Sequence, residues 1–206
     1  MIAAPAALER LREGNARFAA DVSRRVTSRR KRRELAAGQE PFAIVLGCSD
    51  SRVPAELVFD QGLGDLFVIR VAGNIVAPSQ IGSVEFAAER FRTRLVVVLG
   101  HSTCGAVVAT LEQLQRPSTE QSPGLRSIVD RIRPAIHGLP ATESREALVR
   151  EAVRANIRLS VNQLRHGSDI LERLIEHDGL LVIGAEYSLD TGVVAFFDGI
   201  PGPAAT

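Results

Sequence analysis

Two short motifs in this sequence combine residues that can do chemistry. The first, GCSDSR, places Cys48, Asp50 and Arg52 on alternate positions directly after the apolar run FAIVL. The second, GHSTCG, places His101 and Cys104 in an H-x-x-C spacing after another apolar run. A free cysteine in a core is usually a small hydrophobe, but aspartate and arginine are seldom buried without a partner. The two motifs together therefore indicate a functional site rather than simple packing.

Cys48, His101 and Cys104 form a ligand set that zinc prefers. Two thiolates and an imidazole bind Zn²⁺, and three protein ligands leave the fourth tetrahedral position open, as in catalytic rather than structural sites. The chain has no third cysteine to close the site. Two alternatives stay open at this point: unrelated core thiols, or a redox-active pair of cysteines. The remaining histidines lack ligand spacing and are interpreted as ordinary surface or helix residues: His137, His166 and His177.

Asp50 and Arg52 are predicted to act beside the metal. If the extended conformation continues past the strand, alternation puts both side chains on the same side as Cys48. A carboxylate beside zinc can accept a hydrogen bond from a bound water or hydroxide. Arginine can hold that carboxylate in a bidentate pair and keep it ionised. The alternative is a structural ion pair in a loop.

The pattern of apolar runs predicts how these residues are positioned. Continuous apolar runs predict buried parallel strands at residues 42–47, 65–71, 94–101 and 179–187, with an antiparallel strand at 193–197. Helices are expected at residues 5–20, in a short segment ending at Gly38, and at 79–91, 105–115, 124–133, 143–165 and 168–177. This alternation indicates an α/β fold with a central, mostly parallel sheet, four parallel strands plus an antiparallel fifth, flanked by helices. Ligands bind beyond the carboxyl ends of such strands, and both cysteine motifs stand at strand ends.

Length and composition restrict the remaining possibilities. The 206 residues suit a single domain, with a helical N-terminal arm at about 5–38 and a loose tail at about 199–206. The net charge of +1 favours neither nucleic acid nor membrane as a partner. No apolar stretch has membrane-helix length or signal-peptide character, so we expect a cytoplasmic protein. The basic segment at 24–33 is interpreted as a solvated loop and helix start; a nucleic-acid patch is the alternative, although it lacks interleaved aromatic residues.

The chain resembles the β-class carbonic anhydrases over roughly residues 5–198. The resemblance is densest at GCSDSRV, DLFVIRVAGN and VVLGHSTCGAV. It implies one zinc ion on Cys48, His101 and Cys104, with Asp50 and Arg52 as the adjacent dyad. The activity it implies is reversible hydration of CO₂ to bicarbonate and a proton by a zinc-bound hydroxide.

Further residues correspond to the family by motif. Gln39 matches a glutamine that hydrogen-bonds substrate, and Phe67 matches an aromatic residue of the CO₂ cleft. Phe86 stands where many members have tyrosine. The N–H of Gly105 matches an anion-binding position, at a predicted helix N-terminus. Some members form an inhibitory bicarbonate pocket in which a tryptophan takes part. Here Val45 stands at the tryptophan position, whereas Arg70 and Tyr187 match two other residues of the pocket, so the pocket is incomplete.

The resemblance also implies an obligate dimer with active sites near the interface; in this family dimers often pair further into tetramers or larger assemblies. The N-terminal helix carries Leu8, Leu11 and Phe18 on one apolar face, which we expect a single domain not to need for its own core. By the resemblance, this helix is expected to reach across to the partner subunit. Two other functions stay open: hydrolysis of carbonyl sulfide or carbon disulfide on the same fold, and zinc binding without catalysis.

Overall fold

A single five-stranded sheet organises the chain. The computed structural model describes residues 2–24, 28–116, 122–139 and 144–200. The strands lie in the order β2-β1-β3-β4-β5. The first four are parallel, and β5 pairs antiparallel to β4 with a register shift at Gly184/Ala185. Their bounds are β1 Ala43–Gly47, β2 Leu66–Arg70, β3 Leu95–His101, β4 Leu181–Tyr187 and β5 Val194–Asp198. This confirms the mostly parallel sheet with an antiparallel fifth strand.

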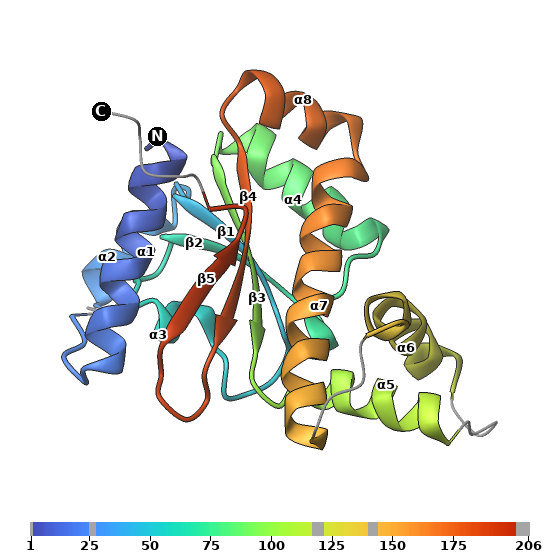
Figure 1. Cartoon of the computed structure of the whole chain (residues 1–206). Coiled ribbons are helices and arrows are strands. Elements are labelled where there is room, and N and C mark those ends of the chain that lie inside the picture. The colour runs from blue at the N-terminus through green and yellow to red at the C-terminus, as the bar shows by residue number, and fades with distance from the viewer. Residues whose placement is uncertain (1, 25–27, 117–121, 140–143, 201–206) are drawn as a thin grey trace, which may run out of the picture.

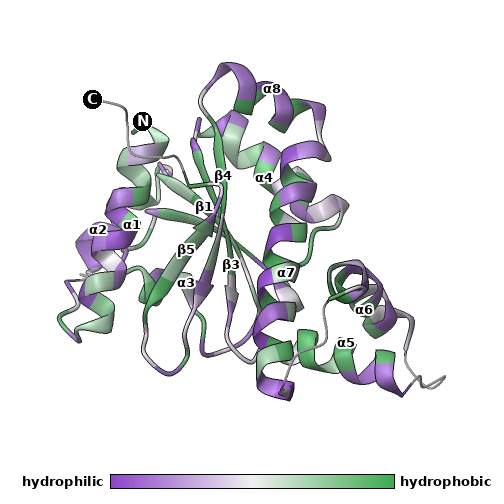
Figure 2. Cartoon of the chain, viewed as in Figure 1, coloured by the Kyte–Doolittle hydropathy of each residue, from purple (hydrophilic) through white to green (hydrophobic). Residues whose placement is uncertain are grey.

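Helices cover both faces of the sheet (Figure 1). Because both faces of each central strand are then buried, successive side chains along it are apolar. Every residue of β1 and β3 is buried. Alternate side chains point into two cores: Ile44 and Val96 face one, Val45 and Val97 the other. Figure 2 shows the same pattern as apolar strands between helices that carry polar outer surfaces.

The helices form two unequal layers around the sheet. In Figure 1, α1 and α3 lie on one side, while α4, α7 and α8 lie on the other, and α5 and α6 project beside α7. Their bounds are α1 Ala4–Ala19, α2 Arg29–Leu35, α3 Ala55–Val58, α4 Pro78–Arg90, α5 Gly105–Gln115, α6 Pro123–Ile136, α7 Arg145–His166 and α8 Asp169–His177, with a 3₁₀ turn, η1, at Ala72–Asn74.

The apolar face of α1 belongs to its own chain. Leu8 and Leu11 are 3% and 0% exposed and pack in the same core as β1 and β3. Phe18 is half-buried, and its ring lies 6.3 Å from that of Tyr187. The expectation that the chain's own core does not need this face is therefore wrong, because Leu8 and Leu11 cover the sheet.

Smaller differences from the sequence-based expectations have local causes. The sequence did not predict α3 or η1, which are too short to show a periodic apolar pattern. Helix α6 continues through Pro134 to Ile136 instead of stopping at residue 133. No described helix is long and apolar enough to span a bilayer. Part of the basic segment (residues 25–27) and most of the predicted loose tail (201–206) lie outside the described residues.

Candidate metal centre

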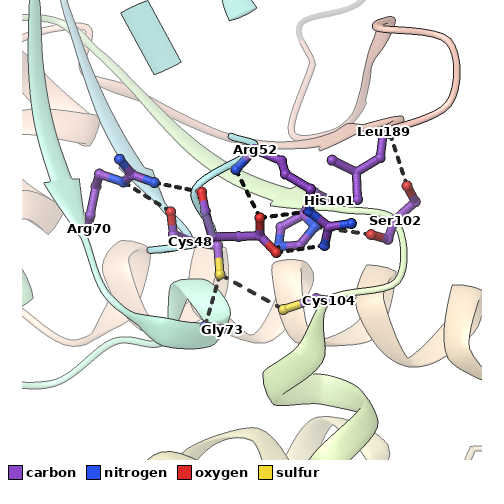
Figure 3. A network of polar contacts seen from close by, with 9 residues as sticks. Cys48, Arg52, Arg70, Gly73, His101, Ser102, Cys104 and Leu189 are labelled. Carbon is purple, nitrogen blue, oxygen red and sulfur yellow. Dashed lines mark hydrogen bonds and ion pairs between the residues drawn. The ribbon is translucent and has the colours of Figure 1, made fainter. Parts of the chain in front are cut away.

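The fold brings the three predicted zinc ligands together at one edge of the sheet (Figure 3). Cys48 follows β1, His101 ends the neighbouring β3, and Cys104 stands immediately before α5. Their ligand atoms all lie within 4.8 Å of one another, and all three residues are buried. The two sulfur atoms are 4.0 Å apart. Two thiolates about 2.3 Å from a tetrahedral zinc are separated by about 3.8 Å, so the observed spacing fits this metal.

The imidazole of His101 is oriented for ligation. Its Nδ1 lies 3.0 Å from the carbonyl oxygen of Ser102, which can only accept, so Nδ1 carries the proton and Nε2 the free lone pair. The ring is 0% exposed, and among the described residues Nε2 has no hydrogen-bond partner. A buried nitrogen without a partner is costly. A metal ion between it and the two sulfurs would satisfy it, and the hydrogen bond at Nδ1 is of the kind that orients metal-binding histidines.

The two thiols share their protons unequally. The hydrogen bond with Cys104 has the largest effect on the pKa of Cys48. Together with the imidazole of His101 and the backbone N–H groups of Asp50 and Gly73, it lowers this pKa to about 4. The Cys48 sulfur in turn raises the pKa of Cys104, as does burial. Of the two thiols, Cys48 therefore ionises first, and a cation bound between the sulfurs would favour the thiolate form of both.

Asp50 reaches the site through a turn, not through an extended chain. The N–H of Val53 donates to the carbonyl of Asp50, and the N–H of Arg52 donates to its carboxylate, both at 3.0 Å. This turn folds the Arg52 guanidinium onto the carboxylate in the predicted bidentate pair, at 3.0 and 2.8 Å. The hydrogen bond from Arg52 holds the pKa of Asp50 well below its usual range. The Oδ2 atom that accepts from Arg52 Nη2 also lies 3.8 Å from His101 Nε2.

Arg70 fixes the backbone that carries these residues. Its guanidinium donates to the carbonyls of Cys48 at 3.1 Å and Asp50 at 2.7 Å. Tyr187 is buried in the core on the opposite face of the sheet, with Val45, and burial raises its pKa. Two of the positions that resemble a bicarbonate pocket are thus core residues here, and the third binds backbone.

Comparison with known proteins identifies the family. The sequence profile described as carbonic anhydrase matches residues 43–194. The chain belongs to the β-carbonic anhydrases. It is 38% identical over 196 residues to carbonic anhydrase 2 of Mycobacterium tuberculosis, covering 95% of this chain and 93% of that one. It is also 38% identical over 190 residues to the carbonic anhydrase of Mycolicibacterium smegmatis, covering 92% and 91%.

Solved β-carbonic anhydrases share the fold over almost the whole chain. The structure of CcaA superposes with a TM-score of 0.74 at 26% identity, covering 97% of this chain and 91% of that one. CafA of Aspergillus fumigatus gives 0.72 at 25% identity, covering 96% and 92%. The resemblance inferred from the motifs is therefore confirmed, and the chain is an enzyme of this family.

The substrate-binding residues predicted for this carbonic anhydrase do not all meet within one chain. Gly105 begins α5 next to Cys104 and is exposed. Phe67 pairs with Ile44, four residues before Cys48, so it lies about 13 Å back along the strands at about 3.3 Å per residue. The rings of Phe67 and Phe86 are 6.2 Å apart, and both pack on Phe91.

Gln39 lies with this aromatic group rather than with the cysteines. It precedes β1, at the opposite end of the strand from Cys48, and lines a surface hollow with Phe91. Phe86 is 53% exposed. One chain thus presents the candidate metal centre at one strand end and the group predicted to contact substrate near the other.

The sequence analysis missed one backbone group at the centre. The N–H of Gly73, in η1, donates to Cys48 Sγ at 3.4 Å. Its motif, RVAGN, was part of the family resemblance. Nothing in the motif shows that this glycine contacts a residue 25 positions earlier.

Proposed function

We propose that this β-carbonic anhydrase catalyses the zinc-dependent reversible hydration of CO₂ to bicarbonate and a proton. The observation that carries the proposal is the buried, unpartnered Nε2 of His101 facing two thiols, one of them with its pKa lowered to about 4. Zn²⁺ held by Cys48, His101 and Cys104 would lower the pKa of a bound water and so supply a hydroxide nucleophile.

The dyad orients the nucleophile. Asp50 faces the metal side of His101 and accepts a hydrogen bond from the attacking oxygen, which directs the lone pair of that oxygen at the carbon of CO₂. Arg52 keeps the carboxylate ionised and in place through its two hydrogen bonds. The exposed N–H of Gly105, the first residue of an 11-residue helix, is available to the negative charge that develops on the substrate oxygens.

The apolar part of the substrate site comes from a second copy of the chain. Phe67 lies about 13 Å along the strands from the level of its own Cys48, and Gln39 precedes the far end of β1, so neither reaches substrate there. Phe86 packs on Phe67 and is 53% exposed. A two-fold dimer places this group of each chain over the metal centre of the other. The partially exposed Phe67–Phe86 pair then becomes the wall against which CO₂ rests, and the Gln39 amide can hydrogen-bond its oxygen. We also assign the enzyme to the cytoplasm, because its two unpaired site thiols suit a reducing compartment.

Metal analysis and stopped-flow CO₂ hydration test the chemistry. We expect one zinc per wild-type chain, and loss of both zinc and turnover in Cys48→Ala, His101→Ala and Cys104→Ala. Full zinc and full turnover in any of the three would remove that residue from the ligand set. Turnover of carbon disulfide with none of CO₂ would leave the metal centre intact but change the substrate.

Mixing two inactive variants tests the shared site. Cys48→Ala lacks a ligand, and Gln39→Ala lacks the substrate amide, so each homodimer should be impaired. A mixed dimer has one metal centre with all of its ligands, served by the partner's intact amide. Random exchange should therefore restore about one quarter of the wild-type sites. No gain on mixing, with subunit exchange verified by mass, would show that Gln39 does not act across the interface.

A further inference from the structure

The turn η1 lies directly beneath the candidate metal centre and supplies one hydrogen bond to it. Gly73 N–H donates to Cys48 Sγ at 3.4 Å (Figure 3). Gly73 has φ +72°, and a Cβ there would lie 2.8 Å from Ile132 Cδ1. The following residue, Asn74, also has positive φ, +43°. Two successive residues in the left-handed region do not hold this shape by themselves, since glycine moves easily between conformations.

Two buried side chains of α7 hold the turn from below. Asn156 Nδ2 donates to the carbonyl of Gly73 at 2.8 Å, and Ser160 Oγ donates to the carbonyl of Asn74 at 3.0 Å. Both residues are 1% exposed and lie one helical turn apart. They bind different residues: Asn156 hydrogen-bonds Gly73, whose N–H contacts the sulfur, whereas Ser160 hydrogen-bonds Asn74.

We propose that Asn156 is a positioning residue of the metal centre, which fixes Gly73 so that its N–H stays on the sulfur of Cys48. The inference rests on the proposed function, because it assigns Cys48 as a zinc ligand. The contact chain runs from α7 through the Gly73 carbonyl and the Gly73 N–H to the sulfur, with each step buried. An N–H donor on a thiolate withdraws electron density from it and holds its lone pairs in one orientation. Asn156 thus sets both the direction and the donor strength of one ligand without touching the metal or the substrate.

The matched pair Asn156→Ala and Ser160→Ala tests this role. Each variant removes one buried hydrogen bond from the same turn, so both should lose comparable thermal stability. Only Asn156→Ala should weaken zinc binding, by about 10- to 100-fold in competition with a chelator. In the Co²⁺-substituted proteins, only Asn156→Ala should shift the sulfur-to-cobalt charge-transfer band to lower energy, because a thiolate that loses a hydrogen bond gives up an electron more readily.

The outcomes separate this role from a merely structural one. If Asn156→Ala binds zinc as tightly as Ser160→Ala and shows the same cobalt band, the inference is overturned. If Asn156→Ala is recovered unfolded, Asn156→Val, which fills most of the same space and has no hydrogen-bond donor, should give the same weakened binding and shifted band; unchanged readings would overturn the inference. A wild-type chain that binds no zinc would overturn the proposed function, and this inference with it. That result is distinct from tight zinc binding in every variant.

Discussion

Acid should remove a defined part of the stability of this protein through Asp60. Its side chain is 0% exposed and accepts hydrogen bonds from Arg17 Nε and Ser23 Oγ, both at 2.6 Å, and from the N–H of Arg24 at 3.1 Å. Burial by itself would raise the pKa of Asp60, but these bonds outweigh it and lower the pKa to about 2, from 3.8. The carboxylate therefore binds its proton more weakly in the folded chain than in the unfolded one.

The sign and the size of the effect follow from that difference. A lowered folded-state pKa stabilises the protein at pH values above the unfolded pKa, and this stabilisation is lost as the pH falls towards 2. A pKa difference of nearly two units corresponds to about 2.5 kcal/mol at about 1.4 kcal/mol per unit, of which about 2 kcal/mol is lost by pH 2. Asp60→Asn has nearly the same shape but cannot titrate, so it should lack this pH-dependent component.

Urea unfolding of wild type and Asp60→Asn at pH 7, 5, 4, 3 and 2 measures this component. A chelator is present with both proteins, so that loss of zinc in acid does not contribute to the difference. The wild type should be more stable at pH 7, and its advantage should shrink by about 2 kcal/mol between pH 5 and pH 2. An advantage that stays constant across this range would refute the reasoning. It would show that Asp60 has the same affinity for its proton in both states.

Three further outcomes are expected. Asp50→Asn and Arg52→Ala should each keep one zinc per chain and lose about 10²- to 10³-fold in CO₂ hydration, and wild-type turnover in Asp50→Asn would make the carboxylate merely structural. The value of kcat/KM for CO₂ should rise from about pH 7 to 9, because two thiolates leave less positive charge at the metal than three histidines, whose zinc-bound water has a pKa of about 7. Arg52 keeps Asp50 ionised throughout that range, so a flat profile with zinc retained would contradict the ligand set. Gly14→Ala should lower the free energy of unfolding by about 3 kcal/mol or more, because its Cβ would clash with the carbonyl of Phe59. Gly38→Ala is the control, since a Cβ there meets nothing within 4 Å. Equal urea midpoints for the two variants would refute the clash.

The ligand set and the sheet were predictable from sequence because both are encoded locally. A strand buried on both faces must be a continuous apolar run, and parallel strands must deliver their carboxyl ends to one edge. Cys48, His101 and Cys104 stand at such ends, so short-range pattern and a topological rule together suffice to bring them near one another. The bidentate contact of Asp50 with Arg52 could likewise be predicted from the sequence, because the two residues are close along the chain.

Tertiary structure alone decided the features that depend on distant segments meeting. The sequence left the apolar face of α1 apparently free, because nothing in Leu8 or Leu11 shows that the sheet behind them is otherwise uncovered. It assigned Gln39 to substrate but could not show that this residue stands at the far end of its strand from Cys48. It gave no sign that Asn156 supports Gly73, since a buried polar residue in a helix has no periodic signature that names its partner. The sequence directly determines side-chain type and local periodicity. The contacts between side chains of distant segments are determined only when the helices and strands pack.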